Sequence, residues 1–124
     1  ADTHRFGPEA GDHGRKVVAE TILGSIRSHD SAARIGGEEF CVVLPNSSRK
    51  SSTDIAERLR RRIEGMTIPT AAGSVRTTIS AGIAFSAAQD ETIQSLLNKA
   101  DQALYEAKSS GRNRIQVSGF SLVA

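Results

Sequence analysis

Residues 33–44 read Ala33-Arg34-Ile35-Gly36-Gly37-Glu38-Glu39-Phe40-Cys41-Val42-Val43-Leu44. Two runs, 33–35 and 40–44, are apolar apart from Arg34, and both are as short as strands commonly are. The pair Gly36-Gly37 separates them, and adjacent glycines between apolar runs are typical of a tight turn. The stretch therefore predicts a β-hairpin, which Pro45 and the polar residues after it bring to an end.

Three segments around this hairpin repeat apolar residues at the spacing of an amphipathic helix, namely 9–28, 51–66 and 92–109. Two further runs, 75–85 and 115–117, are rich in residues that favour strands. A helix with one apolar face needs an apolar surface to cover, and a sheet supplies one. We therefore predict an α/β fold, an α+β sandwich in which helices flank a mixed, largely antiparallel central sheet.

The composition indicates a single folded domain over residues 1–124, with 38% hydrophobic and 24% charged residues. No apolar run approaches the roughly 20 residues that span a bilayer, and no signal peptide opens the chain. A single cysteine favours a reducing cytoplasm, although a membrane anchor outside the given residues stays open. The net charge of +2 suits a phosphate-bearing ligand, whereas four Phe and one Tyr offer few stacking surfaces for nucleic acid.

Cys41 and Gly82 lie inside predicted strands, and each has two interpretations. Cys41 is either a nucleophile or a small core residue. We predict the core residue, because buried free cysteine usually behaves as a small hydrophobe. Gly82 marks either a bulge or a point where another backbone comes close, and the residues alone leave both open.

The carboxylates Glu38 and Glu39 directly follow the glycine pair of the predicted hairpin. Gly36 and Gly37 let a ligand approach the backbone because no Cβ blocks it. Carboxylates on a tight turn are good ligands for Mg²⁺, which prefers hard oxygen donors and is often bound together with substrate phosphates. A solvated turn explains the same residues, so the pattern alone leaves both interpretations open.

Residues 34–40 resemble the signature of the GGDEF family of diguanylate cyclases, with Glu38 at the position where that family allows Asp or Glu. Other segments resemble family motifs in the same order along the chain: Phe6-Gly7-Pro8-Glu9-Ala10-Gly11-Asp12, Thr78-Ile79-Ser80-Ala81-Gly82-Ile83-Ala84, Ala100-Asp101-Gln102-Ala103-Leu104-Tyr105-Glu106-Ala107-Lys108 and Ser110-Gly111-Arg112-Asn113. Each motif alone is weak, but together they cover nearly the whole chain. The resemblance implies a fold similar to nucleotidyl cyclases and polymerase palm domains.

The resemblance further implies an enzyme, a diguanylate cyclase that condenses two GTP molecules into cyclic di-GMP and pyrophosphate with Mg²⁺ or Mn²⁺. Glu38 would be a metal ligand, and Glu39 would be a second required carboxylate that acts on the metal or on the attacking hydroxyl. Gly36 and Gly37 would pass close to the nucleotide. Because one such domain holds one GTP, the resemblance also implies a homodimer for catalysis, and a sensory domain N-terminal to the module.

Three further residues are implied to bind the substrate: Asp12 at the guanine edge, and Lys108 and Arg112 at the terminal phosphates. Each has an alternative interpretation. Asp12 also suits the cap of the first helix, and both roles are compatible. Lys108 and Arg112 also suit ordinary cations near the C-terminus of a helix, where they interact favourably with the helix dipole.

A second site is implied by Arg27-Ser28-His29-Asp30, whose R-x-x-D pattern and placement are similar to the inhibitory site where this family binds its cyclic product. Arg27 suits this role because a guanidinium can grip a phosphate or a guanine edge with two parallel hydrogen bonds. Arg58 lies where the family often adds an arginine to the site. Against this, R-x-x-D is common by chance. Arg58 also joins 60–62 in a basic cluster that a solvated helix face explains.

The chain departs from the family pattern at its N-terminal end. The family has a strand with D-x-D-x-F-K before the first helix. An alignment without gaps starts this chain after that strand, so we expect the first strand to be absent and the domain to be N-terminally incomplete. In the alternative register Asp2-Thr3-His4-Arg5-Phe6 imitates D-x-D-x-F, with His4 in place of an Asp. The guanine-contacting Asn of the family falls on Thr3, or on Ala1 if two residues are inserted, and Pro8 replaces a His.

These departures leave a second function open, a degenerate GGDEF domain that binds GTP or cyclic di-GMP as a non-catalytic regulatory module. The missing Asp and the changed guanine contact favour it, whereas the intact Glu38, Glu39, Lys108 and Arg112 favour the cyclase. A more general nucleotidyl cyclase and an interaction module without a ligand are further alternatives. Selectivity for GTP over ATP tests the former, and stabilisation by a nucleotide tests the latter.

Overall fold

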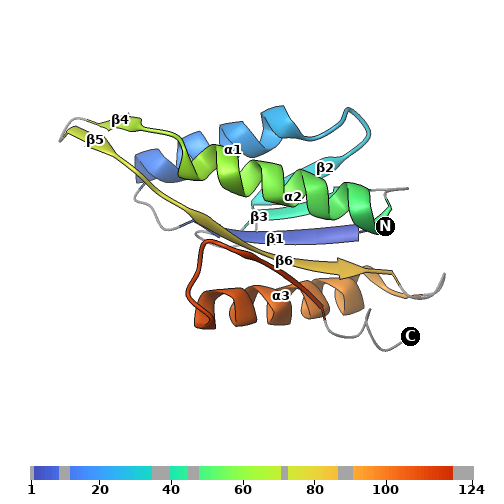
Figure 1. Ribbon diagram of the computed structural model, residues 1–124. Coiled ribbons are helices and arrows are strands. Elements are labelled where there is room, and N and C mark those ends of the chain that lie inside the picture. The colour runs from blue at the N-terminus through green and yellow to red at the C-terminus, as the bar shows by residue number, and fades with distance from the viewer. Residues whose placement is uncertain are drawn as a thin grey trace.

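The computed structural model describes residues 2–8, 12–34, 40–44, 48–70, 73–86 and 91–118. Its elements, coloured along the chain in Figure 1, are β1 Asp2–Pro8, α1 Asp12–Ser25, β2 Ser31–Arg34, β3 Phe40–Leu44, α2 Arg49–Glu64, β4 Ile68–Thr70, β5 Gly73–Val75, β6 Ile79–Phe85, α3 Ile93–Ser109 and β7 Ile115–Val117. The helices lie where the apolar periodicity predicts them. None of the helices in the described ranges is long and apolar enough to cross a membrane.

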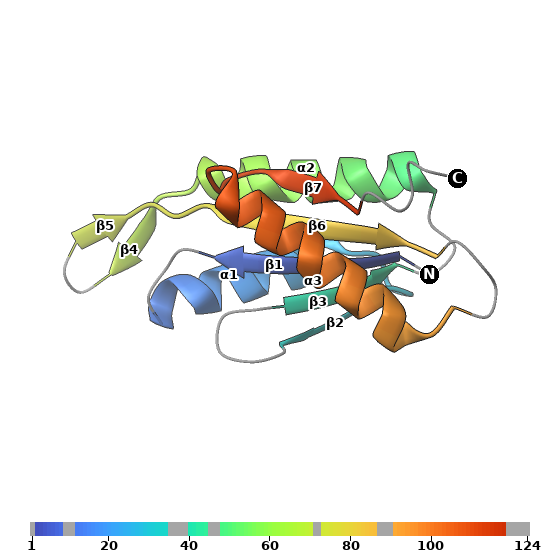
Figure 2. The ribbon, with the colours of Figure 1, turned by 90° about the horizontal axis from the view of Figure 1, so that it is seen from below.

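The described strands form one five-stranded sheet in the order β2-β3-β1-β6-β7 and a separate hairpin of β4 and β5. Neighbouring strands of the large sheet are antiparallel, except that β7 runs parallel to β6. Helices α1 and α2 cover one face of this sheet and α3 covers the other (Figures 1 and 2). The predicted fold class, helices on a mixed and largely antiparallel sheet, is therefore confirmed.

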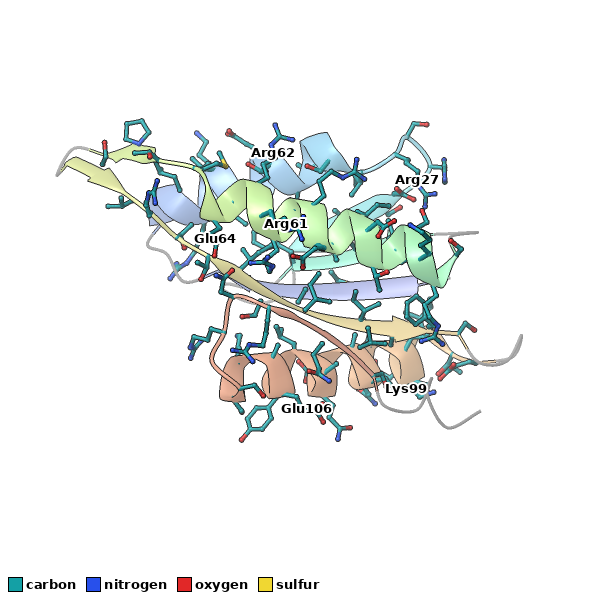
Figure 3. All side chains as sticks on the ribbon, viewed as in Figure 1. Arg27, Arg61, Arg62, Glu64, Lys99 and Glu106 are labelled. Atoms are coloured by element: carbon teal, nitrogen blue, oxygen red, sulfur yellow. The ribbon has the colours of Figure 1, made fainter. Side chains whose placement is uncertain are left out.

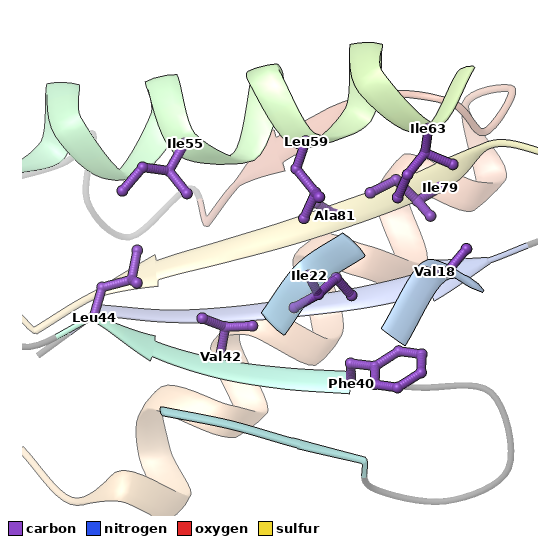
Figure 4. Packing of buried hydrophobic residues seen from close by; sticks show 10 residues of the cluster. All are labelled: Val18, Ile22, Phe40, Val42, Leu44, Ile55, Leu59, Ile63, Ile79 and Ala81. Carbon is purple, nitrogen blue, oxygen red and sulfur yellow. The ribbon is translucent and has the colours of Figure 1, made fainter. Parts of the chain in front are cut away.

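The main core lies between the sheet and the two helices α1 and α2 (Figure 4). On α2 the buried residues Ile55, Leu59 and Ile63 recur every four positions, as a helix with one buried face requires. They meet alternate residues of two strands and one face of α1, namely Phe40, Val42, Leu44, Ile79, Ala81, Val18 and Ile22. Burying one large aliphatic side chain contributes about 1.5–3 kcal/mol, so this layer is a major source of stability.

The fold decides between the two interpretations that the sequence left for Gly82 and tests the prediction for Cys41. A Cβ at Gly82 would lie 2.2 Å from the carbonyl oxygen of Ala100 and 2.3 Å from the amide nitrogen of Leu104, both in α3. The pairing of β6 with β1 continues in register through Gly82, so the glycine marks a close backbone approach and not a bulge. Cys41 is buried in β3, which confirms that it is a small core residue.

The predicted absence of a first strand is wrong, because residues 2–8 form β1 in the middle of the sheet. β1 pairs with β3 from Asp2 to Phe6 and with β6 from Asp2 to Pro8. The physical reason is that a ladder of hydrogen bonds uses backbone N–H and C=O groups, which almost every residue carries. A segment whose side chains match a family strand poorly can therefore still fill the place between two buried strands.

The hairpin of β4 and β5 was not predicted, and it shortens a strand that was. The run predicted as one strand over 75–85 is divided, because residues 76–78 lie outside any strand and separate β5 from β6. Each hairpin strand has three residues, and Ile68 is buried whereas Val75 is exposed. So short a segment has too few residues to show a periodic pattern in the sequence.

Candidate functional site

One end of the sheet carries the motif that joins β2 to β3. Arg34 and Phe40 are paired across the two strands. The chain between them lies outside the described residues and holds four predicted site residues, Gly36, Gly37, Glu38 and Glu39. Elsewhere in the described part of the chain, no three His, Cys, Asp or Glu side chains gather so that they could hold a metal ion. The metal-binding roles of Glu38 and Glu39 therefore stay predictions.

The pairing of β1 brings the start of α1 to the same end of the sheet. Phe6 pairs with Phe40, the first residue of β3, and Pro8 pairs with Ile79, the first residue of β6. α1 begins at Asp12, shortly after β1 ends, so its N-terminus lies at this end, on the left in Figure 1. Asp12 thus belongs to the same end as the β2–β3 connection, although its side chain lies outside the described part of the chain.

The loop between α3 and β7 reaches this end as well. β7 runs parallel to β6 with Ile115 paired to Ala81, so the chain enters β7 where β6 begins. Lys108 lies half-buried in the last turn of α3, and Arg112 lies exposed in the loop. The fold therefore brings Lys108 and Arg112 to the end of the sheet that also holds Asp12.

The loop over residues 110–114 has an unusual backbone. Gly111 has φ 123°, Arg112 has φ 64° and Asn113 has φ 48°. Arg112 and Asn113 are the non-glycine residues with positive φ in the described ranges. A left-handed conformation costs a residue with a side chain roughly 1–2 kcal/mol, less for Asn, so the surrounding contacts must offset this cost.

Arg60 of α2 links that helix to the loop through a network of ion pairs and hydrogen bonds. Its Nη2 donates to Glu57 Oε1 at 2.5 Å and its Nη1 donates to Asn113 Oδ1 at 2.9 Å. Asn113 Nδ2 donates to Glu64 Oε2, and Asn113 N–H donates to Ser80 Oγ at 3.1 Å. Hydrogen bonds from Arg60, opposed by partial burial, hold the pKa of Glu57 below its usual range. Asn113 is thus bonded to α2 and to β6 at once.

Arg60 is the residue of this end that the sequence did not single out. Its run of arginines was interpreted as a solvated helix face, and Arg58, Arg61 and Arg62 are indeed exposed. The Arg60 side chain is only 15% exposed. The sequence did hold a signal that Arg60 is paired. Glu57 and Glu64 stand three residues before and four residues after it, where side chains on one helix are neighbours.

The register of β1 decides what this strand brings to the site. Asp2 pairs with Leu44, four positions along β3 from the Phe6–Phe40 pair. At about 3.4 Å per residue, Asp2 is about 14 Å from the end where β2 joins β3. The residues of β1 nearest that end are Phe6, Gly7 and Pro8, none of which is acidic. The pairing of β1 therefore puts the backbone of Asp2 at the opposite end of the strand from the β2–β3 connection.

The R-x-x-D residues lie at the opposite end of the sheet, between α1 and β2. Arg27 grips the Asp30 carboxylate with Nε at 2.9 Å and Nη2 at 3.0 Å, and its backbone N–H donates to the same carboxylate at 2.7 Å. The Asp30 side chain is 0% exposed. Burial raises the pKa of Asp30, but the hydrogen bonds and charge of Arg27 outweigh this, so the net pKa lies below the usual value. Figure 3 shows Arg27 far from Glu64 of the other end.

A cavity of about 530 Å³ opens beside this ion pair. Arg27 and Arg58 line it together with the start of α2, including Ser48, Ser51, Lys50 and Asp54. Lys50 and Asp54 form an exposed ion pair at 2.8 Å. The structure therefore brings Arg27 and Arg58, two predicted product-site residues, to one cavity, with Asp30 buried against Arg27.

Comparison with known proteins identifies the family. The chain matches the family described as "Diguanylate cyclase, GGDEF domain" over residues 3–114. It is 40% identical over 113 residues to diguanylate cyclase A of Treponema denticola, covering 91% of this chain and 30% of that protein. The chain therefore spans about 30% of the length of this curated relative.

Solved structures agree with the family match. The active GGEEF domain of a diguanylate cyclase from Vibrio cholerae has a TM-score of 0.83 and 25% identity, covering 94% of this chain and 81% of that one. The GGDEF domain of DgcB from Caulobacter crescentus, solved in complex with c-di-GMP, has a TM-score of 0.88 at 24% identity, covering 94% and 77%, and shows the fold alone. The motif order, the fold and the family match agree, and the chain belongs to the GGDEF domain family of diguanylate cyclases.

Proposed function

We propose that this chain is a catalytic diguanylate cyclase domain that condenses two GTP molecules into cyclic di-GMP and pyrophosphate. The observation that supports it best is the convergence at one end of the sheet of the β2–β3 connection, the start of α1 and the loop 110–114. Together with the last turn of α3, which holds Lys108, these three segments carry every residue to which we assign a substrate or metal role. Segments distant in sequence meet there, as a site for a large nucleotide requires.

The triphosphate would be held by Lys108 and Arg112. One cation belongs to the last turn of α3 and the other to the loop directly after it, so both can reach one row of phosphates. A guanidinium can bind phosphate oxygens with two parallel hydrogen bonds, and an ammonium adds a compact charge. Asp12 would accept hydrogen bonds from the N–H groups of the guanine edge, since a carboxylate is an acceptor only. Gly36 and Gly37 would let the nucleotide approach the backbone.

Glu38 and Glu39 would hold a divalent metal, Mg²⁺ or Mn²⁺. Two carboxylates together with substrate phosphates suit a hard cation that keeps several oxygen ligands, so this donor set fits. When bound, the metal stabilises negative charge on the phosphates. Glu39, directly after Glu38 in the sequence, would also take the proton of the attacking 3′-hydroxyl. The oxygen of that hydroxyl would then bond to the α-phosphorus of the second GTP while pyrophosphate leaves.

The product needs two such bonds, one from each nucleotide to the other. If each domain holds one GTP, two copies must face one another, so the active unit would be a homodimer. In a longer chain, a sensory domain N-terminal to this module would control that encounter. The homodimer follows from the proposed chemistry, whereas the sensory domain is what the resemblance to the family implies.

Arg27, Asp30 and Arg58 would form an inhibitory site for the cyclic product. The cavity beside Arg27 and Arg58 is large enough for part of a dinucleotide and carries two guanidinium groups suited to phosphate or a guanine edge. Asp30 orients Arg27 through two side-chain hydrogen bonds. Because this cavity lies at the far end of the sheet from Arg112, product bound there would not compete directly with GTP.

The register of β1 favours a second candidate function, a regulatory module that binds nucleotide without catalysis. β1 brings no acidic residue to the end of the sheet where the metal would bind, and Asp2 lies opposite Leu44. A site with two carboxylates where the family pattern has three would bind metal more weakly. Binding without product formation would identify this function.

The test is chromatography of the purified chain incubated with GTP and Mg²⁺. We expect cyclic di-GMP and pyrophosphate, and we expect Glu39→Gln to lower the rate by a factor of about 10² or more while its circular dichroism and melting temperature stay those of the wild type. GTP that raises the melting temperature but gives no product would reject the cyclase in favour of the regulatory module. ATP consumed as fast as GTP would instead indicate a general nucleotidyl cyclase.

A further inference from the structure

The backbone on both sides of Arg112 is held by hydrogen bonds to its surroundings. Arg112 N–H donates to the carbonyl oxygen of Ala107 at 3.0 Å, and the Arg112 carbonyl accepts from Arg114 Nε at 3.1 Å. The next residue, Asn113, is held by its own N–H on Ser80 Oγ at 3.1 Å. Ser80 is fully buried in β6, so this last contact ties the loop to the sheet.

Asn113 is the centre of this arrangement because its side chain uses both of its polar ends. Its Oδ1 accepts from Arg60 and its Nδ2 donates to Glu64, and both partners lie on α2. Asn tolerates the left-handed conformation at φ 48° better than most residues, and an amide supplies a donor and an acceptor at once. The position therefore combines a backbone requirement with a side-chain requirement.

Glu57, on the same helix, holds the Arg60 guanidinium in place, and the remaining nitrogen of Arg60 bonds the loop. Its Nε lies 3.2 Å from Glu57 Oε1 and 3.1 Å from Oε2, and its Nη2 lies 2.5 Å from Oε1. The remaining Nη1 bonds Asn113 and lies 3.7 Å from Glu64 Oε2. A planar guanidinium with five donors in a fixed fork can make these contacts together, whereas the ammonium of a lysine cannot.

We infer that Asn113, supported by Arg60, is a positioning residue that sets the direction in which Arg112 presents its side chain to the terminal phosphates of GTP. The inference rests on the proposed function, in which Arg112 binds those phosphates. Two successive left-handed residues would relax to other conformations without contacts that hold them. A loop held in its binding conformation loses less conformational entropy when the ligand binds, so the network acts through the affinity for phosphate.

The test compares binding of two probes by calorimetry in the presence of Mg²⁺. One probe is the α,β-methylene analogue of GTP, whose α–β bridge cannot be cleaved, and the other is GMP, which lacks the terminal phosphates. Asn113→Gly keeps the left-handed backbone accessible while it removes both side-chain contacts with α2. We expect this variant to bind the analogue about tenfold more weakly and GMP with unchanged affinity.

A double-mutant cycle shows whether the effect passes through Arg112. In an Arg112→Ala background, Asn113→Gly should cause no further loss of affinity for the analogue, because the group that it positions is gone. Arg60→Lys should resemble Asn113→Gly, since it keeps a charge beside Glu57 but loses the fork. Arg62→Lys, a change at an exposed residue of the same helix whose side chain reaches Ser25 of α1, should match the wild type.

The outcomes separate the inference from the proposed function. If the wild type binds neither probe, GTP binding itself is refuted and the inference falls with it. If the wild type binds the analogue and Asn113→Gly binds it equally well, the inference alone is refuted. Equal losses for the analogue and GMP, or full additivity with Arg112→Ala, would likewise refute positioning in favour of a general structural role. Melting temperatures show that each variant is folded.

Discussion

The two ends of the sheet use charged side chains in different ways. At the end near Arg112, an arginine of α2 reaches Asn113, 53 positions away in the sequence, and ties a helix to a loop. At the opposite end, Arg27 pairs with Asp30 three residues later, and Lys50 pairs with Asp54 four residues later. The contact of Arg60 with Asn113 connects distant segments, whereas the Arg27–Asp30 and Lys50–Asp54 ion pairs each stay within one turn.

This difference teaches what each end is built to do. Contacts between distant segments hold a loop in a backbone conformation that it would not keep alone, which suits residues that must be ready before a ligand arrives. Local contacts leave the space between the elements open, and a cavity of about 530 Å³ remains beside Arg27 and Arg58. One end is therefore preorganised, and the other is a preformed opening with orienting groups at its edge.

The largest effect, on the free energy of unfolding, is expected at the contact of β6 with α3. In Gly82→Ala the new Cβ would meet the backbone of Ala100 and Leu104, neither of which can move without shifting the helix. We expect the free energy of unfolding to fall by about 3 kcal/mol, measured by urea denaturation. α3 leads directly into the loop that carries Arg112.

Gly24→Ala in α1 is the matched control, because a Cβ at Gly24 would have nothing within 4 Å. Alanine loses less conformational entropy than glycine in a helix, so this variant should be more stable by about 0.5–1 kcal/mol. An unfolding free energy for Gly82→Ala within 0.5 kcal/mol of the wild type would show that the backbone of α3 does not lie as close to Gly82 as described.

A smaller effect, on the affinity for cyclic di-GMP, is expected from Arg58→Ala, which removes one of the side chains that line the cavity. We expect the Kd for cyclic di-GMP, measured by calorimetry, to rise about tenfold, because a charge-assisted hydrogen bond to the ligand is lost. Arg61→Ala is the control, since Arg61 lies on the same helix with a side chain 73% exposed. Equal affinities in Arg58→Ala and wild type would remove Arg58 from the proposed product site.

The smallest effect is expected from Asp30→Asn, which keeps the shape of the local turn but removes its charge. The pKa of Asp30 is lower in the folded chain than its usual 3.8, so the ion pair stabilises the fold above that pH. As the pH falls through the folded pKa, that contribution is lost. We expect the variant to be less stable by about 1 kcal/mol at neutral pH, with the difference from wild type shrinking below pH 3.8.

Asp54→Asn is the comparison for this pH series, because Asp54 forms an exposed ion pair that should contribute little. Urea denaturation between pH 3 and 7 measures both variants. A stability difference between Asp30→Asn and wild type that grows as the pH falls would contradict the sign of the pKa shift.

Much of the fold could be read from the sequence because its signals are local. The helical spacing of Ile55, Leu59 and Ile63 predicts the buried face of α2, and the glycine pair between apolar runs predicts that β2 and β3 are neighbours. The order of the short motifs predicted the family. Each of these signals depends on residues within one element or one turn, where side-chain period reports directly on burial.

The tertiary structure alone decided the rest. It placed β1 between β3 and β6 and so put Asp2 at the far end of the sheet, because strand pairing depends on backbone groups that carry no sequence signal. It also decided which side chains Arg60 contacts, whereas in the sequence Arg60 is one of several arginines on a helix. Its partner Asn113 lies in another element, and only the packing of α2, β6 and the loop 110–114 brings the two side chains together.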